Sequence, residues 1–577
     1  MKVNKYIISA LVCPFVLGSC ADDWKYDVEK PQTIAQYEYL NDYAPLKENL
    51  DRSAHPGFKV SGALGVDEFN QQGPLFRLAA HNFDEIVAGN AMKMASCVND
   101  EGVMDFSKVS SFVSAAEDAG LTVYGHTLAW HAQQPRKWLE KLIADKELDV
   151  DPGQKTFTEL SRQTYQDGKF PFYQMGCAPD VINGSIHFVP TGDWSQFFCV
   201  SGLALTPGNY AVDVEIKSTK AGNIKMKVQN GWDPKNESCD GIVALKEGWT
   251  TARFKMTLEQ GGNYDFILQP ETFDATLDLK SVTVKKIVKT NSIPLTPKEK
   301  SDTLTWAMNK WISGMMQATG GKVKAWDLIN EAISGDGDVN GFYPLQTEAT
   351  SEHNPQDFYW QDYFTPEMYG PIVEKAARDA YAAVEGTNPA DLKLFINDYN
   401  LESDWDNNQK VKSLVYWIGV WEKKGKELGW NTKIDGIGTQ MHIDYYENPK
   451  TLESKKKGIE NMLKIMAETG KLVRISEIDM GYVDKDGKDV TTAQLEKLPI
   501  DERVAKEKAM AEHYKWIIEQ YFKIVPVKQQ YGICQWCLTD APTNSGWRPG
   551  KPVGLWNLNY QRKPAYGGFA DGLSEGK

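Results

Sequence analysis

Eight short apolar runs are spread along the chain, and most of them end in a polar or aromatic cluster. They cover residues 60–65, 83–87, 121–128, 323–329, 392–396, 434–438, 472–475 and 531–536. Helix-like segments separate several of them; in 301–316, apolar side chains recur every three or four residues. Continuous apolar strands alternating with helices predict an α/β fold, a parallel (β/α)8 TIM barrel, whose active site forms where the strands end.

The gap between the third and fourth runs is far longer than one βα unit needs. Within it the hydrophobic pattern changes, because apolar and polar residues alternate in 210–216 and again in 224–228. Period two with repeated glycine-containing turns predicts an antiparallel sandwich of jelly-roll type, inserted in the loop after strand 3. The predicted units are the inserted β-sandwich at 151–289 and one discontinuous barrel at 40–150 and 290–577.

Composition narrows the range of partners. A net charge of −14 and a pI of about 5.3 argue against a nucleic-acid partner, and a mean hydropathy of −0.47 argues against a polytopic membrane protein. No glycine-rich nucleotide motif and no HExxH zinc motif is present, so we expect no cofactor. The 18 tryptophans suit an uncharged polyhydroxyl ligand.

The N-terminus has the features of an export signal. Two lysines precede an apolar run at 6–17 that is too short to span a bilayer permanently, which predicts a signal peptide at 1–19. Residues 17–20 (LGSC) resemble a bacterial lipobox, which implies cleavage before Cys20, its lipidation, and a tether at 20–39. A plain secretory signal with a chance cysteine is the alternative. We expect a monomeric outer-membrane lipoprotein at the cell surface, or alternatively on the periplasmic face.

Neither the cysteines nor the acidic loop at 336–341 predicts a metal site. The six cysteines beyond Cys20 are too sparse for a disulfide-built scaffold. Cys534 and Cys537 have C-x-x-C spacing, but in a strand this offset puts the side chains on opposite faces, so we predict two core cysteines. Residues 336–341 resemble the opening of a calcium loop but lack the acidic residue at its twelfth position.

Two glutamates follow apolar runs in strongly patterned surroundings, Glu331 in WDLINEA (326–332) and Glu477 in SEID (476–479). Splitting a glycosidic bond needs a protonated carboxyl group on one side of the anomeric carbon and an ionised carboxylate on the other. Singly, each glutamate would be interpreted as a surface or ion-paired residue. Their joint placement at the ends of the fourth and seventh runs predicts a glycosidase site.

These two segments resemble the signature motifs of glycoside hydrolase family 10, the endo-β-1,4-xylanases. Similar motifs follow in order along the chain: GHTLAWH (125–131), FINDYN (395–400), GIGTQMH (436–442) and WCLTD (536–540). The resemblance covers the proposed barrel and none of 151–289. It implies a TIM-barrel hydrolase that cleaves xylan or xylo-oligosaccharides with retention of configuration.

The resemblance also implies roles for individual residues. Glu331 would be the general acid/base and Glu477 the nucleophile of a double displacement. His442 and Asp479 would keep Glu477 charged and oriented, and Asp479 lies two residues after Glu477, on the same strand face. The implied sugar-binding residues are Asn90, Lys93, His126, Trp130, Gln133, Asn330 and Gln440 on the glycone side, Trp536 and Trp547 around the cleaved sugar, and Tyr399 on the aglycone side.

The chain departs from the family motifs at two positions. Gly89 stands where the family has a glutamate immediately before the asparagine that corresponds to Asn90. The missing carboxylate predicts a weaker or roomier glycone site that tolerates a decorated xylose. Cys537, where the family commonly has glycine, is a smaller departure.

The insert resembles a xylan-binding module of the jelly-roll kind. Its candidates for a sugar-stacking platform are Trp194, Trp232, Trp249, Tyr210 and Phe273. A structural or docking insert is the alternative. For the whole chain, two alternatives to an endo-xylanase remain: a related hydrolase of mixed-linkage glucan or cellulose, and a non-catalytic glycan-capturing lipoprotein.

Overall fold

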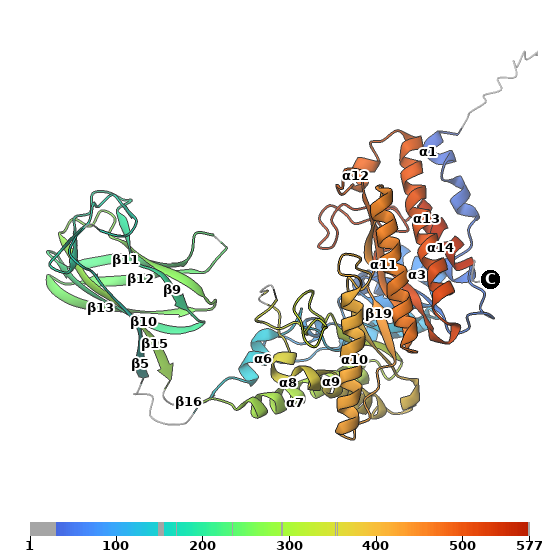
Figure 1. Cartoon of the computed structure of the whole chain (residues 1–577), viewed down its shortest axis with the longest axis horizontal. Helices are drawn as coiled ribbons and strands as arrows, with labels where there is room; N and C mark the ends of the chain where they lie inside the picture. Colours follow the sequence, from blue (N-terminus) through green and yellow to red (C-terminus); the bar gives the residue numbers. More distant parts are fainter. Residues whose placement is uncertain are drawn as a thin grey trace, which may run out of the picture. The chain divides into compact units, whose positions relative to one another are not determined.

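A computed structural model describes residues 30–147, 155–168, 170–233, 235–289, 292–351, 354 and 356–574. The chain divides into two compact units, which we name by their order in the sequence (Figure 1). The inner unit, Ala144–Leu295, interrupts the sequence of the outer unit, which is made of Met1–Ile143 and Thr296–Lys577. The inner unit extends slightly beyond the predicted boundaries. The predicted signal peptide, Cys20 and the start of the tether lie outside the described residues. A search of the described helices for a bilayer-crossing segment finds none of sufficient length and apolarity.

The outer unit contains a closed barrel of eight parallel strands in the order β1-β2-β3-β17-β18-β19-β21-β22, in which β22 also pairs with β1. The strands are β1 Lys59–Leu64, β2 Glu85–Ala88, β3 Thr122–Gly125, β17 Ala325–Asn330, β18 Lys393–Asp398, β19 Gly436–Thr439, β21 Leu472–Val483 and β22 Gln530–Gln535. Each predicted apolar run overlaps one of these strands, so the predicted (β/α)8 barrel is confirmed. The short strand β20 (His442–Tyr446) adds to the end of β21.

Helices follow the strands around the barrel (Figure 1). The longer ones are α3 Pro74–Asn82, α5 Ser107–Asp118, α6 Arg136–Leu142, α7 Pro297–Ala318, α9 Pro366–Ala382, α10 Gln409–Glu427, α11 Pro449–Glu468, α13 Ile500–Ile524 and α14 Pro564–Ser574. Short α-helices are α1 Gln32–Ala35, α2 Val66–Asn70, α4 Met94–Cys97, α8 Gln361–Phe364 and α12 Thr492–Leu495. Short 3₁₀ helices are η1 Glu38–Asp42, η2 Leu46–Glu48, η3 Pro389–Asp391 and η4 Val527–Gln529.

Helix α7 includes the segment predicted to be helical from its spacing. A capping box between Thr296 and Glu299 satisfies backbone N–H groups at its start, and Pro297 fits the first turn. The apolar side chains of the predicted stripe are fully buried: Leu304, Ala307, Met308, Trp311, Ile312 and Met315. The stripe therefore fixes α7 to the barrel.

The barrel interior is filled by side chains, so the strand ends are the part of the barrel that can form a cleft. Besides apolar residues it holds a buried ion pair, in which the Arg474 Nη1 lies 2.6 Å from the Glu85 Oε1. Cys534 belongs to this core, as predicted. The prediction is wrong for Cys537, because β22 ends at Gln535 and the loop that follows turns Cys537 toward the cleft.

The inner unit is a sandwich of two antiparallel sheets. One has the order β13-β10-β15-β8-β7, with β5 also paired to β15, and the other has the order β12-β11-β14-β9-β6. Their strands are β5 Lys155–Thr164, β6 Gln174–Met175, β7 Asp180–Ile182, β8 Ser185–Phe188, β9 Gln196–Leu205, β10 Gly208–Ser218, β11 Gly222–Asn230, β12 Ser238–Leu245, β13 Gly248–Leu258, β14 Gly262–Gln269 and β15 Leu277–Lys289. A two-stranded ribbon, β4 Lys146–Glu147 with β16 Ser292–Ile293, joins the ends of the unit.

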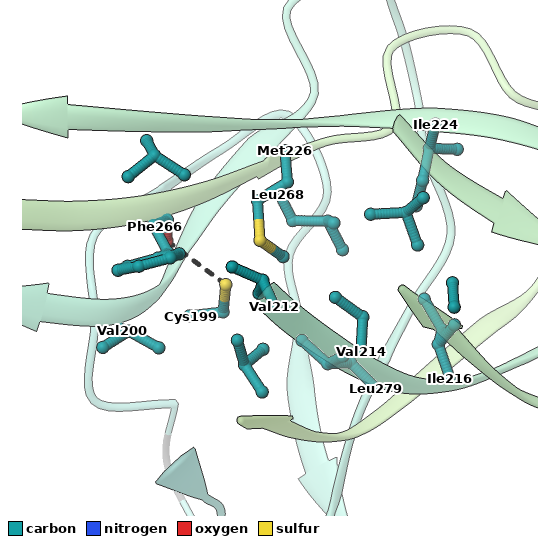
Figure 2. Close-up of a cluster of buried hydrophobic side chains, with 14 of the residues drawn as sticks. Cys199, Val200, Val212, Val214, Ile216, Ile224, Met226, Phe266, Leu268 and Leu279 are labelled. Carbon is teal, nitrogen blue, oxygen red and sulfur yellow. Dashed lines mark hydrogen bonds between the residues drawn. The ribbon is translucent and has the colours of Figure 1, made fainter. Parts of the chain in front are cut away.

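The period-two pattern places the sandwich core correctly. Val212, Val214 and Ile216 on β10 face Met226 and Leu268 of the opposite sheet (Figure 2). All five side chains are inaccessible to solvent. The predicted β-sandwich, inserted after the third barrel strand, is therefore confirmed.

Candidate active site

A cleft of about 1000 Å³ opens at the carboxyl ends of the barrel strands. It is lined by residues that the sequence predicted to bind or cleave sugar: Asn90, Lys93, His126, Trp130, Gln133, Asn330, Glu331, Gln440, His442, Glu477, Trp536 and Trp547. Two predicted residues do not line it. Asp479 is fully buried behind His442, and Tyr399 lies at the end of β18 with its ring over the Lys410 ammonium.

Glu331 enters the cleft through a turn of the backbone. β17 ends at Asn330, and Glu331 adopts a left-handed conformation with a φ of 54°. Such a conformation is costly for a residue other than glycine and persists where neighbouring bonds enforce it. Here the Glu331 N–H donates to the Asn397 carbonyl (2.8 Å), and the Gln346 side-chain amide donates to the Glu331 carbonyl (2.9 Å).

The Glu331 carboxyl group is surrounded by neutral hydrogen-bond donors. Its Oε1 accepts from the Gln440 Nε2 (2.7 Å) and the Asn330 Nδ2 (3.2 Å), and its Oε2 accepts from the Trp130 Nε1 (3.0 Å). Burial raises the pKa of Glu331; the Gln440 hydrogen bond opposes this, while the negative charges of Asp398 and Glu477 add to it. The group is thus suited to hold a proton that it can donate.

Glu477, on β21, has a charged partner instead. Its Oε1 accepts from the Asn397 Nδ2 (2.8 Å), and its Oε2 lies 3.3 Å from the His442 Nε2. Burial by itself would raise the pKa of Glu477. The hydrogen bond from His442 lowers the pKa, and so does the electrostatic attraction of the His126 and His442 rings. Together they outweigh burial, so the pKa of Glu477 lies below its ordinary value. Glu477 is thus suited to remain ionised.

His442 links Glu477 to Asp479. Its Nδ1 lies 3.0 Å from the Asp479 Oδ2, so the imidazole stands between two carboxylates. Burial would lower the pKa of His442, but the hydrogen bonds to Asp479 and Glu477 raise it to about 10. At neutral pH the ring is an imidazolium, which donates to both carboxylates.

Asp479 is itself held by the loop after β22. The Trp547 Nε1 donates to its Oδ2 (2.8 Å), and the Arg548 Nη1 donates to its Oδ1 (2.5 Å). Although burial would raise the pKa of Asp479, the bonds from His442 and the charge of Arg548 lower it. The Cys537 thiol is a further, weaker donor at 3.6 Å. Arg548, which also pairs with Asp444, was not predicted, since no motif or periodicity marks it.

A bridge of amides joins the two glutamates. The Asn397 Nδ2 donates both to Glu477 and to the Asn330 Oδ1 (2.9 Å), while Asn330 donates to Glu331. The Ser476 hydroxyl donates to the Asn397 Oδ1 (2.6 Å) and so fixes the orientation of the amide. Asn397 was also missed as a site residue, although it directly follows the fifth apolar run and lies within a recognised motif.

One side of the cleft is lined by residues near β2 and β3. The Lys93 ammonium donates to the Asn90 Oδ1 (3.1 Å) and lies 4.8 Å from the centroid of the Trp130 ring. Next to Asn90, a Cβ added at Gly89 would meet only the Leu64 carbonyl, at 3.7 Å. Gly89 lines the cleft, and a Cβ at this position would make no clash.

His126, Asp327 and Glu477 are the one group in the described part of the chain with metal-compatible donors, all within 4.8 Å of one another. Both Asp327 oxygens have partners, since its Oδ1 accepts from the Tyr124 hydroxyl (2.6 Å) and its Oδ2 lies 2.8 Å from the His126 Nδ1 within the group. These bonds orient the His126 ring where it lines the cleft.

A model of glycosyl hydrolase family 10 matches residues 49–187 and 281–572. The chain is 29% identical over 268 residues to Endo-beta-1,4-xylanase Xyn10C of Cellvibrio japonicus, over 44% of this chain and 37% of that protein. It is 28% identical over 282 residues to Endo-1,4-beta-xylanase A of Cellvibrio japonicus (strain Ueda107), over 44% of this chain and 38% of that protein. The chain thus spans less than two fifths of the length of these two curated relatives.

The solved structure of native xylanase10C from Cellvibrio japonicus aligns with 92% of this chain and 74% of its own, at 18% identity and a TM-score of 0.50. At this identity the likeness supports the fold alone. The family match includes all eight barrel strands and every residue that lines the cleft. The chain belongs to glycosyl hydrolase family 10.

Proposed function

We propose that the chain is a retaining endo-β-1,4-xylanase that hydrolyses internal bonds of xylan. One observation carries this proposal: two carboxyl groups share one cleft, Glu331 bonded by neutral donors and Glu477 by the His442 imidazole, and this difference shifts their pKa values in opposite directions. Separated pKa values are what an acid and a nucleophile need in order to act at the same pH. Xylan is proposed as the substrate because the curated relatives are named as endo-xylanases.

In the first step, the ionised Glu477 attacks the anomeric carbon and forms a covalent ester with the sugar. The glycosidic C–O bond breaks, and the leaving oxygen takes the proton of Glu331. In the second step, the Glu331 carboxylate removes a proton from water, whose oxygen attacks the same carbon. The ester bond breaks, and Glu477 is ionised and Glu331 protonated again, ready for the next cycle.

The hydrogen bonds around each group support these roles. The imidazolium of His442 stabilises Glu477 as a leaving carboxylate in the second step and limits its basicity in the first. Asn330, which lies between the two glutamates in the amide bridge, is proposed to bond the sugar 2-hydroxyl, a contact that strengthens toward the transition state. Reducing-sugar release from xylan against mixed-linkage glucan distinguishes the proposed substrate from the glucan alternative.

Replacing the nucleophile tests the mechanism. We expect Glu477→Ala to lower kcat on xylan by at least about 10³-fold, as for loss of a reacting group in other hydrolases. The Kd for xylo-oligosaccharides should change little, because the other cleft residues remain. Glu468→Ala, an exposed glutamate at the end of α11, is the matched control and should keep the wild-type kcat. Proton NMR of early products should detect the β-anomer first; α-anomer first would refute retention.

The pH dependence of kcat/KM should be bell-shaped. Activity falls at low pH when Glu477 gains a proton, and its pKa lies below the ordinary value of 4.5. Activity falls at high pH when Glu331 loses its proton, and its pKa lies above 4.5. Gln440→Leu removes a bond that favours the charged form of Glu331, so the alkaline limb should move to higher pH. Asp398→Asn removes a negative charge that favours the protonated form, so the limb should move to lower pH. Shifts of both variants in the same direction would contradict the assignment.

Gly89 is proposed to leave space for a decorated sugar on the glycone side. Gly89→Glu should raise kcat/KM for unsubstituted xylo-oligosaccharides by about tenfold, as expected for a hydrogen bond to a charged group. It should lower kcat/KM for substituted ones, because the new side chain occupies the space beside Asn90. Gly89→Ala adds only a Cβ and should resemble the wild type. Identical kinetics of Gly89→Glu and the wild type on both substrates would end this proposal.

We also propose that the chain is exported and anchored to the outer membrane through a lipid on Cys20, facing the cell exterior. The short apolar run at 6–17 and the lipobox-like residues 17–20 support it. In cells that express the full chain, Cys20→Ala should move the protein from the membrane fraction to the soluble fraction. Protease treatment of intact cells should remove the wild type. Membrane retention of Cys20→Ala would contradict lipidation, and protection from protease would favour the periplasmic face.

A further inference from the structure

The inserted sandwich carries three neighbouring aromatic rings on one face, which we name the aromatic strip: Tyr173, Phe198 and Trp232. The Phe198 ring centroid lies 5.8 Å from that of Tyr173 and 5.8 Å from that of Trp232. Tyr173 and Trp232 are 51% and 72% exposed, and Phe198 is half-buried between them. Aromatic side chains usually pack in the core, so three contiguous rings at the surface indicate a site of interaction.

The strands hold this strip on the outer face of the β12-β11-β14-β9-β6 sheet. On β9, Phe197 points into the sandwich core, so Phe198 points outward, beside its cross-strand partner Ile267. The Phe198 N–H donates to the Tyr173 carbonyl (3.0 Å), which ties Tyr173 to the same strand. Trp232 reaches Phe198 from the turn after β11, where Gly231 has a left-handed φ of 66°.

A polar group on the same face has an unmet hydrogen-bonding capacity. Gln229 lies on β11 next to Val228, which points into the core, so Gln229 points outward, opposite Asp265 of β14. The side chain is 5% exposed, yet its Nε2 donates to no group among the described residues. The Asp265 Oδ1 is already used by the Ser201 hydroxyl (2.9 Å). A buried amide without an acceptor is costly, and the hydroxyl of a bound ligand would supply one.

The structure revises the predicted platform. Tyr210 and Phe273 were proposed for stacking, but Tyr210 is inaccessible to solvent within the core and Phe273 packs against that core. Trp194 and Trp249 are exposed but lie elsewhere. Trp249 is on β13 in the other sheet, and the Trp194 ring lies over Gly176. Of the five predicted residues, Trp232 alone belongs to the aromatic strip.

We propose that the aromatic strip and Gln229 form a second glycan site, which binds a β-1,4-xylan chain. Pyranose rings present C–H faces that pack on aromatic rings, and their equatorial hydroxyls accept hydrogen bonds at the edges. The rings therefore stack along the sugar chain, and the Gln229 amide donates to a hydroxyl. The choice of xylan rests on the proposed function of the barrel. The site holds the polymer and takes no part in bond cleavage.

Binding is tested in the full chain with Glu477→Ala, which prevents digestion of the ligand. Adding Tyr173→Ala and Trp232→Ala should raise the Kd for insoluble xylan at least about tenfold, a loss of 1.4 kcal/mol. Trp249→Ala, which removes an exposed tryptophan on the other sheet, is the matched control and should leave the Kd unchanged. An unchanged Kd for the double variant, or an equal loss with Trp249→Ala, would overturn the proposal.

Gln229→Leu separates binding from a merely structural role. The leucine removes an amide that has no protein partner, so the thermal unfolding midpoint should stay the same or rise while the Kd for insoluble xylan increases. A lower midpoint together with an unchanged Kd would show a structural role and overturn the proposal for Gln229.

A refutation of the second site can be distinguished from a refutation of the proposed activity of the barrel. In the chain with an intact Glu477, the strip variants should hydrolyse soluble short xylo-oligosaccharides at the wild-type rate, because these substrates need only the cleft. Absence of this hydrolysis in the wild type would refute the proposed function and leave the binding result standing. Normal hydrolysis with no effect of the strip variants on polymer binding would refute the second site.

Discussion

Two carboxyl groups that are buried in one cleft must hold different charges, and the groups behind them decide which one keeps its proton. Burial raises the pKa of both Glu331 and Glu477. Around Glu331 the donors are neutral indole and amide groups, which are too weak to reverse this effect. Glu477 receives a bond from an imidazolium, which reverses it. The charged donor His442, together with the nearby His126, thus separates the pKa values of two carboxyl groups in the same cleft.

The charge on His442 depends in turn on residues far away in sequence. A buried histidine is normally neutral; His442 is charged because Asp479 lies on its other side. Asp479 can remain ionised in a fully buried position because Arg548 and Trp547, from the loop after the last strand, bond to it. The state of the proposed nucleophile is therefore set by a chain of four groups that ends in a loop. The pairing of β21 with β22 brings this loop next to β21.

The sequence predicts the strands and their order better than it predicts the orientation of particular side chains. Apolar runs locate the barrel strands because both faces of such strands are buried. The left-handed turn at Glu331 and the bond from Arg548 left no periodic signal, since each depends on contacts formed only after folding. In the insert, Tyr210 shares the apolar alternation of β10 and is buried accordingly. Its aromatic character alone suggested a platform, whereas its position in the alternation already indicated the core.

The insertion is compatible with the barrel because its two ends lie together. β4 and β16 pair, with Lys146 opposite Ile293, so the chain leaves and re-enters the barrel from neighbouring points. The helices on either side, α6 and α7, then contact each other, as they would with a short connection. The second xylan site that we propose would raise the local concentration of polymer available to the same chain without any change in the catalytic residues. The chains of an insoluble substrate cannot diffuse to the enzyme, so the enzyme must be held on the polymer. The proposed second site would do this, whereas the catalytic residues of the cleft only cleave bonds.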